Sequence, residues 1–408
     1  MKKYFYLCFL LFIVMIIGFP VSGFCVSDQD DNMNMAIKGS NEFSLDFYRQ
    51  LSGSEGNLFF SPYSIAVALA MTYAGARGRT AEQMKQVLRN NLGQGEISSI
   101  FGKMNNDLAS RAVKADCQLD IANALWAQEG FNFLEEYLQL LKNDYNAGVF
   151  TADFIQAAEE ARQKINSWVD GKTAGKIKNL IPEGILSDMT RLVLVNAVYF
   201  QGRWASQFEK GNTREMDFHL NAEKKAATAM MCQKGEFAWL AEDNIEIAVI
   251  PYTGTDLAMV VLLPREIDGL PRLEKDITID KLEKWLSQTH RQELELYIPK
   301  FNVTCGLDLN NILRAMGMTD AFDNKIADFS GMNGHKDLFI SQAMHQAYIK
   351  VNEKGTEATA ATAVVMNLRC ALPKTKIFRA DHPFMFIIRS DKTGNILFMG
   401  RLVRPENQ

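Results

Sequence analysis

Residues 353–362 read Glu353, Lys354, Gly355, Thr356, Glu357, Ala358, Thr359, Ala360, Ala361, Thr362. From Gly355 to position 365 the stretch has no proline, aromatic or basic residue, and Glu357 carries its single charge. Alternate side chains of a strand share a face, so the even positions from 356 to 366 form an uncharged face. Such a peptide can enter a β-sheet without burying a charge. By composition alone, the simpler interpretations are favoured: a flexible linker or an ordinary strand.

Four further motifs, in a consistent order along the chain, change that interpretation. They lie at residues 57–64, 194–204, 381–386 and 398–401. In the first motif, Ser61 before Pro62 is a good helix start, because serine caps the first turn and proline fits its first position. Together with residues 353–362, these motifs closely resemble those of the serpins, and of their inhibitory members in particular. The resemblance runs from about residue 38 to the C-terminus.

Hydrophobic spacing predicts helices first and strands later. Helical periodicity or low polarity marks residues 43–51, 65–74, 131–142, 157–169 and 282–288, and residues 80–83 have the form of a capping box that starts another short helix. Strand patterns mark residues 192–200, 245–250, 257–263, 293–298, 383–388 and 395–403, with a glycine turn between the last two. This order favours an α+β architecture.

The resemblance implies a more specific fold. It predicts a single large serpin-like α+β domain at residues 38–408, with three β-sheets surrounded by about nine helices. It also predicts an exposed reactive loop at residues 353–373. The absence of a Pro- or Ser-rich linker between residues 40 and 408 agrees with one domain.

The resemblance also implies a bond at which a target protease cuts this loop. In the family the bond usually lies sixteen residues after the hinge glutamate, which here places it between Arg369 and Cys370. Arg369 is the only basic residue between positions 355 and 373. An arginine before the cut suits trypsin-like serine proteases, whose specificity pocket holds an acidic residue. A register shifted by one residue would offer Leu368 instead and favour chymotrypsin-like enzymes.

By the same resemblance, residues 353–362 are the hinge of a suicide substrate. The protease attacks Arg369 and forms an acyl-enzyme. The freed side of the loop then adds to the main sheet as a new strand, which is the family's known behaviour, and traps the protease as a covalent 1:1 complex. Two alternatives remain open. The chain is a non-inhibitory serpin that acts as carrier, chaperone or substrate, or it inhibits Arg-specific cysteine proteases.

By resemblance, five residues correspond to the place where the family's sheet opens. Ser61, Ser64, Asn196 and His345 match a polar cluster, and Trp204 matches the site of first loop entry. The simpler interpretation is that these are core polar groups with satisfied hydrogen bonds. The two interpretations are compatible, since a buried polar network must break and re-form when strands part.

Composition argues against several other functions. The 44 Lys and Arg residues against 48 Asp and Glu residues give a net charge of −4, and no basic run of five occurs, so we expect no nucleic-acid partner. The chain lacks a complete phosphate-binding loop and a nucleophile elbow, and its five histidines are scattered. We therefore expect no cofactor, no metal site and no enzymatic activity. The six cysteines have no zinc-site or redox spacing.

Residues 1–25 have the form of a secretory signal peptide. Lys2 and Lys3 precede an apolar stretch at residues 4–17, which is followed by small residues and a proline. We expect cleavage near residues 23–25 and a secreted monomer without stable membrane association. In a bacterial source the protein would be periplasmic or surface-anchored, although bulky Phe24 argues against lipid modification of Cys25.

Overall fold

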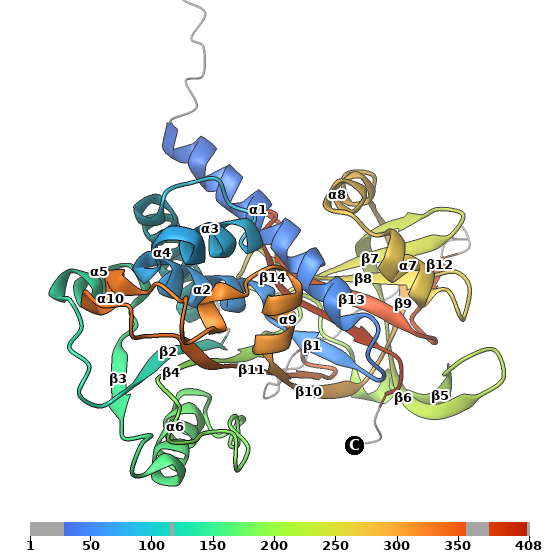
Figure 1. Ribbon diagram of the computed structural model, residues 1–408. Helices are drawn as coiled ribbons and strands as arrows, with labels where there is room; N and C mark the ends of the chain where they lie inside the picture. The colour runs from blue at the N-terminus through green and yellow to red at the C-terminus, as the bar shows by residue number, and fades with distance from the viewer. Residues whose placement is uncertain (1–27, 115–117, 356–374, 406–408) are drawn as a thin grey trace, which may run out of the picture.

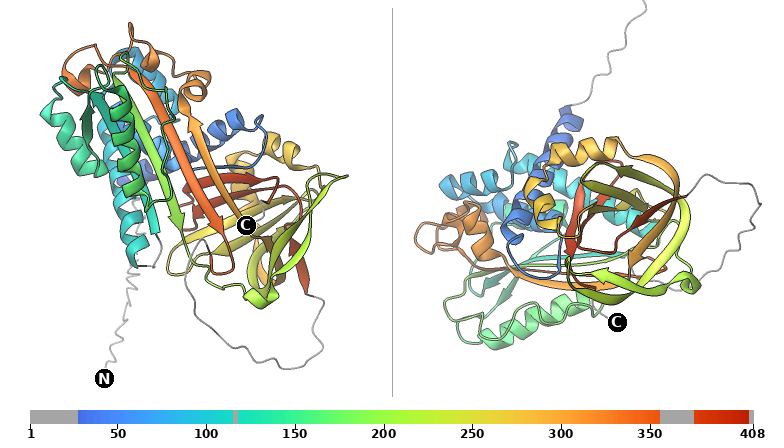
Figure 2. Two further views of the ribbon diagram at one scale, coloured as in Figure 1. Left: turned by 90° about the horizontal axis from the view of Figure 1, so that it is seen from below. Right: turned by 90° about the vertical axis from the view of Figure 1, so that its right-hand side faces the viewer.

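The computed structural model describes residues 28–114, 118–355 and 375–405, and a five-stranded sheet crosses the molecule (Figure 2). In order across this sheet, the strands are β10 (Phe301–Asp308), β11 (Ile340–Val351), β4 (Leu192–Gln201), β2 (Gln118–Gln128) and β3 (Val149–Ala152). β11 and β4 run parallel, whereas each pairs antiparallel with its other neighbour. β4 is buried on both faces, which explains its nearly continuous run of apolar residues.

The other strands form one continuous nine-stranded sheet. The path runs through β1 (Leu58–Phe60), β14 (Ile396–Leu402), β13 (Phe384–Ser390), β8 (Leu257–Pro264), β7 (Ile245–Pro251), β6 (Lys225–Ala241), β9 (His290–Pro299) and β12 (Lys376–Arg379), and β5 (Arg214–His219) pairs with β6 off this path. The α+β class is confirmed. Hydrogen bonds connect the described strands into two sheets, where we predicted three. The reason is that β6, with 17 residues, pairs with β5, β7 and β9 and so joins regions that shorter strands would leave separate.

Helices cover both faces of the five-stranded sheet. The described residues form α1 (Asp28–Leu51), α2 (Pro62–Gly75), α3 (Gly78–Val87), α4 (Gln94–Lys114), α5 (Glu135–Tyr145), α6 (Ala158–Lys172), α7 (Leu270–Asp276), α8 (Ile279–Ser287), α9 (Leu309–Ala315) and α10 (Ser330–Asn333). Figure 1 shows α6 on one side of the sheet and α2 to α5 on the other. The side chains of α6 and the sheet face beneath it form a hydrophobic cluster separate from the main core.

The predicted start of the buried helix is confirmed. All residues of α2 are buried, and Ser61 caps the helix by accepting a hydrogen bond from the Ser64 amide at 3.1 Å, with Pro62 in the first turn. A helix that is buried all round needs apolar residues on every face, as this sequence has. The same cap places the two serines at the sheet surface, next to β4 and β11.

The capping-box prediction at residues 80–83 is wrong, although a helix is present. α3 begins two residues earlier, at Gly78, with Arg77 at the cap position and no side-chain cap bond. The hydroxyl of Thr80 instead accepts a hydrogen bond from the Asp328 amide at 3.0 Å. A contact with a distant segment has therefore replaced the local cap.

Three observations bear on the classes of function considered above. No helix among the described residues is long and apolar enough to cross a membrane. Within that same part of the chain, no three His, Cys, Asp or Glu side chains group as metal ligands. Cys232 and Cys305, which lie in described strands, are free thiols.

Candidate functional site

The candidate site lies along the boundary between β11 and β4. The two parallel strands pair in register from Ile340 opposite Leu192 to Tyr348 opposite Tyr199, with a shift near the start. A strand inserted between them in the opposite direction would replace this parallel pair with two antiparallel pairs. Antiparallel pairs are slightly more stable than parallel ones. The chain that leaves β11 at Val351 can supply such a strand only if it reverses direction at once.

The chain does reverse direction, in a tight turn at residues 352–355. The Asn352 and Gly355 backbones exchange two hydrogen bonds, of 2.9 and 3.1 Å, as an antiparallel pair does. Gly355 also forms an antiparallel bridge with Arg203, just beyond the end of β4. Gly355 is therefore flanked by extensions of both strands and lies where an additional strand between them would begin.

Only glycine fits the position of Gly355. Its φ angle is +138°, a conformation that L side chains rarely adopt. A Cβ atom there would collide with the Gly202 carbonyl oxygen and would lie 2.6 Å from the Arg203 Cα. The close approach to the end of β4 thus explains this hinge glycine.

Glu353 anchors the turn to the nine-stranded sheet. Its carboxylate accepts a hydrogen bond from the Thr213 hydroxyl at 2.9 Å and lies 3.2 Å from the Lys300 ammonium, with 8% of the side chain exposed. Its carbonyl accepts a hydrogen bond from the Phe208 amide at 2.8 Å. Burial alone would raise the pKa of Glu353, but a backbone hydrogen bond and the contacts with Thr213 and Lys300 leave it below the usual value. The carboxylate is therefore ionised at neutral pH.

Trp204 lies against the same turn. Its indole Nε1 donates to the Asn352 carbonyl at 3.0 Å, and its backbone amide donates to the Lys354 carbonyl at 3.1 Å. Its ring stacks on Tyr252 with centroids 4.7 Å apart. The structure therefore brings the described hinge residues Glu353, Lys354 and Gly355 together with Trp204.

The polar cluster lies farther along the boundary and also spans it. Asn196 Nδ2 donates to the Ser64 hydroxyl at 2.6 Å and to the Ser64 carbonyl at 3.1 Å. His345 Nδ1 bonds to Asn196 Oδ1 across the strand pair. The Ser61 hydroxyl donates to the Leu397 carbonyl at 2.7 Å. All four predicted cluster residues are thus in contact, and the contact between His345 and Asn196 joins β11 to β4.

The bonds of His345 determine its protonation. The Ser61 amide donates to His345 Nε2 at 3.2 Å, so that nitrogen is unprotonated. Nδ1 then carries the proton and donates to Asn196. Complete burial lowers the pKa of His345 to about 3, so the ring is neutral at physiological pH.

Three contacting residues had not been identified from the sequence. Asn123 on β2 lies opposite Asn196 and accepts a hydrogen bond from its amide. Thr213 and Lys300 bind the carboxylate of Glu353. Thr213 directly precedes β5, and Lys300 directly follows β9, in the nine-stranded sheet. Asn123 interrupts an otherwise apolar stretch, which is a weak signal of a buried polar contact. Nothing local marks Thr213 or Lys300, because their role depends on the pairing of distant strands.

The remaining predicted residues lie outside the described residues. These are the reactive bond, Arg369 and Cys370, and the rest of the hinge: Thr356, Glu357, Ala358, Thr359, Ala360, Ala361 and Thr362. The described part of the site therefore consists of the entry turn, its anchors and the cluster across the strand boundary.

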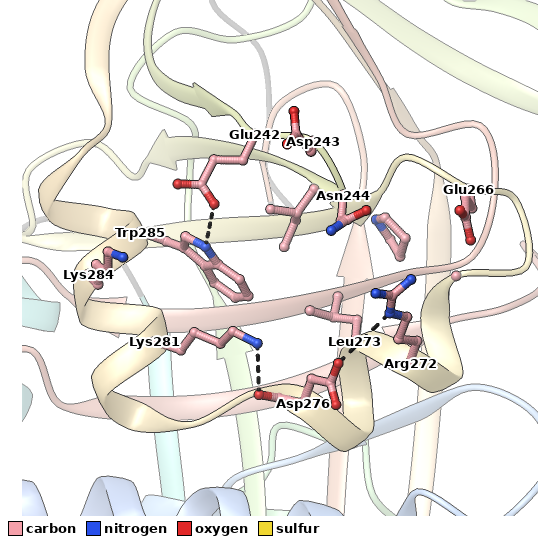
Figure 3. A pocket seen from close by; sticks show the side chains of 13 residues that line it. Glu242, Asp243, Asn244, Glu266, Arg272, Leu273, Asp276, Lys281, Lys284 and Trp285 are labelled. Carbon is pink, nitrogen blue, oxygen red and sulfur yellow. Dashed lines mark hydrogen bonds and ion pairs between the residues drawn. The ribbon is translucent and has the colours of Figure 1, made fainter.

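A surface pocket of about 540 Å³ lies elsewhere, between the α7–α8 helices and the adjoining strand ends (Figure 3). Ile245, Leu273 and Trp285 supply its apolar lining, and charged side chains of both signs surround them. The Trp285 indole donates to Glu242 at 3.1 Å. No predicted site residue lines this pocket, so it is separate from the entry turn and the cluster.

Comparisons with known proteins agree with this geometry. A family model described as serpin (serine protease inhibitor) matches residues 38–405. Serpin B3 of Homo sapiens is 41% identical over 393 residues, covering 91% of this chain and 100% of the relative. Leukocyte elastase inhibitor A of Rattus norvegicus is 38% identical over 383 residues, with the same coverage. Among solved structures, uncleaved ovalbumin is similar with a TM-score of 0.81 and 32% identity, covering 90% of this chain and 100% of that one.

Proposed function

The chain belongs to the serpin family, and from that premise we propose that it is a secreted suicide-substrate inhibitor of trypsin-like serine proteases. In this proposal the target cuts between Arg369 and Cys370 and is trapped as a covalent 1:1 complex. The protein itself is not an enzyme, because the nucleophile and the catalytic machinery belong to the target.

The observation that carries the proposal is the position of Gly355, which bridges extensions of both β11 and β4. Continuing that register places Thr356 opposite Val351, and Thr362 between His345 and Asn196. The side chains at even-numbered loop positions would then lie on the same buried face of the sheet as Ala347 and Ile349 of β11. That loop face is uncharged and mostly small, as insertion requires.

Insertion has a large favourable free energy. About twelve inserted residues, at a net ~1 kcal/mol per hydrogen bond, contribute on the order of 10 kcal/mol before side-chain burial. This equals the whole stability of a typical domain. A kinetic barrier must therefore hold the uncut form. The contact between His345 and Asn196, which insertion would separate, is one part of that barrier.

Arg369 supports the choice of a trypsin-like target. Enzymes of that class bind an arginine side chain in an acidic pocket. The relative called leukocyte elastase inhibitor is named for a different target, so the likeness to it supports protease inhibition in general and not this specificity. The proposal of secretion depends on residues 1–25, which precede the family match at residue 38. The mass of the protein recovered from the culture medium tests it.

Incubation with trypsin tests the inhibitory mechanism. We expect a protease adduct that survives denaturing electrophoresis, and a released peptide that begins at Cys370 by mass spectrometry. With chymotrypsin in place of trypsin, an adduct and a released peptide that begins at Arg369 would show the shifted register and a chymotrypsin-like target. Cleavage without an adduct would contradict inhibition and favour the non-inhibitory alternative.

A matched variant separates cleavage from trapping. Thr356→Arg places a charge on the face that must enter the sheet, whereas Glu357→Arg changes the opposite face. We expect the first variant to be cut without trapping, and the second to trap trypsin. Equal trapping by both variants would contradict insertion in this register. An Arg-specific cysteine protease tested in parallel distinguishes the remaining alternative.

A further inference from the structure

Arg111, near the end of α4, forms an ion pair with the turn between β7 and β8. Its Nη1 lies 2.8 Å from Asp256 Oδ1, and its Nη2 lies 2.5 Å from Asp107 Oδ2, one helical turn earlier. Only 25% of the Arg111 side chain and 20% of the Asp256 side chain are exposed. Asp256 also accepts a hydrogen bond from the Ser390 hydroxyl at the end of β13. The pair therefore joins α4 to the turn between two interior strands of the nine-stranded sheet.

This ion pair is charged and partly shielded from water. Burial raises the pKa of Asp256, but the bonds from Ser390 and Arg111 more than offset that effect and leave the pKa below its usual value. Asp256 is therefore ionised at neutral pH. A pair with this much burial is screened less by salt than a fully exposed pair.

The other side of the same turn contacts the point of loop entry. The Thr253 amide donates to the Arg203 carbonyl at 2.8 Å, and the Ala205 amide donates to the Pro251 carbonyl at 2.9 Å. Tyr252 stacks on Trp204. Arg203 and Trp204 are the residues that meet the turn at 352–355. The segment 251–256 is thus held between α4 and the end of β4.

These contacts connect α4 to the end of β4 through the segment 251–256. The end of β4 is also paired on its other side, where Gln201 lies opposite Gln118 of β2. The chain beyond β4 contacts the segment 251–256, and Asp256 returns to Arg111. Among these contacts, the ion pair is the one between charged side chains, so charge substitutions break the connection there and leave the backbone pairs in place.

We propose that the Arg111–Asp256 ion pair is a latch that holds the end of β4 at the loop-entry turn and slows insertion of the new strand. The inference rests on the insertion mechanism proposed above and adds two positioning residues that do not touch the target protease. When the end of β4 moves away from β11, the chain beyond it pulls on the segment 251–256 and so on the ion pair. The ion pair resists that motion in the uncut protein.

The rate of peptide insertion tests the latch without a protease. A fluorescein-labelled peptide that copies residues 356–367 is mixed with the intact protein, and its incorporation is followed by fluorescence anisotropy. We expect Asp256→Asn to speed incorporation roughly fivefold, as expected for loss of one partly buried ion pair. The amide oxygen of this variant can still accept the hydrogen bond from the Ser390 hydroxyl. Asp107→Asn is the matched control, because it removes the other carboxylate beside Arg111 without releasing the turn, and its rate should match that of the unmodified protein.

Two further measurements separate a latch from a general loss of stability. Raising the salt concentration should speed incorporation in the unmodified protein and in Asp107→Asn, but not in Asp256→Asn, because only that variant lacks the screened pair. Arg111→Gln combined with Asp256→Asn should be no faster than either single variant. Arg111→Lys, which keeps the charge, should give an intermediate rate.

Several results would overturn the latch. These are an unchanged rate in Asp256→Asn, an equal effect of Asp107→Asn, or fully additive effects in the double variant. If the unmodified protein traps trypsin while the variants behave alike, the latch alone is wrong. If the unmodified protein neither incorporates the peptide nor traps trypsin, the insertion mechanism itself is wrong.

Discussion

Replacing Asn196 with alanine should weaken the uncut form more than the cut form. In the uncut protein Asn196 accepts a hydrogen bond from His345 Nδ1 and donates to the Ser64 hydroxyl, the Ser64 carbonyl and Asn123 Oδ1. The variant leaves the buried His345 donor without an acceptor, which costs about 1–3 kcal/mol, and removes the bonds to Ser64 and Asn123, worth ~1 kcal/mol. We expect a total of about 3 kcal/mol, or unfolding of the uncut form roughly 10²-fold faster.

In the cut form the inserted strand would separate His345 from Asn196 and bring Thr362 between them. The histidine then has a new acceptor, and the variant loses only the contacts of the Asn196 amide with Ser64 and Asn123. The expected cost falls to ~1 kcal/mol. The difference between the two forms therefore isolates the contact that crosses the boundary between β11 and β4.

The assay is the unfolding rate in denaturant of the uncut protein and of the protein cut in the loop by a catalytic amount of a protease that it does not trap. Asn302→Ala is the matched control, because Asn302 lies in the same sheet on the edge strand β10 and is only partly buried. We expect that control to change the unfolding rate little in either form. If Asn196→Ala changes the unfolding rates of the uncut and the cut form by the same factor, the reasoning is refuted.

Three other substitutions test the entry turn. Thr356→Arg should convert the inhibitor into a substrate, measured as turnover of trypsin-cut protein without a covalent adduct. Gly355→Ala should lower the thermal midpoint of the uncut protein, since its Cβ would collide with the Gly202 carbonyl oxygen; an unchanged midpoint would contradict the turn geometry. Glu353→Gln should destabilise the uncut protein above about pH 5 and have less effect below about pH 4. The folded pKa of Glu353 is lowered, so its stabilisation is present above the unfolded value of ~4.3 and is lost as the pH falls through the folded value. A destabilisation independent of pH would count against the ionised contact with Lys300.

Local sequence patterns predicted several elements well. The strands predicted at residues 192–200, 245–250, 257–263 and 293–298 correspond to β4, β7, β8 and β9, because buried strands need continuous or alternating apolar residues wherever they pair. The Ser61-Pro62 helix start also depends only on neighbouring residues. By contrast, the capping box predicted at residues 80–83 is not formed. The Thr80 hydroxyl instead accepts a hydrogen bond from the Asp328 amide, a contact that local spacing does not encode.

The candidate site was likewise predicted only in part. The polar cluster and the entry tryptophan followed from resemblance. The described structure brings the four cluster residues into contact with one another and places Trp204 against the turn at 352–355. Asn123 was missed because it acts across the pair of β2 with β4, whose register is set by the whole sheet. Lys300 was missed because it meets Glu353 only once the two sheets are in place. The reactive bond at Arg369 stays a prediction that rests on spacing and charge.

The two-residue hairpin turn at 352–355 has a kinetic consequence. Forming a β-ladder is slow at its nucleus, because loop closure costs entropy before any rung is gained. Here the nucleus exists before a protease arrives, so insertion needs no new loop closure and proceeds from a fixed end as β11 and β4 part. The effect of a bulky substitution on insertion should then depend on its position. Near 356 it would prevent all later residues from pairing, whereas near 366 it would leave most of the new strand paired. The protease, tethered at the far end, would be dragged and deformed last.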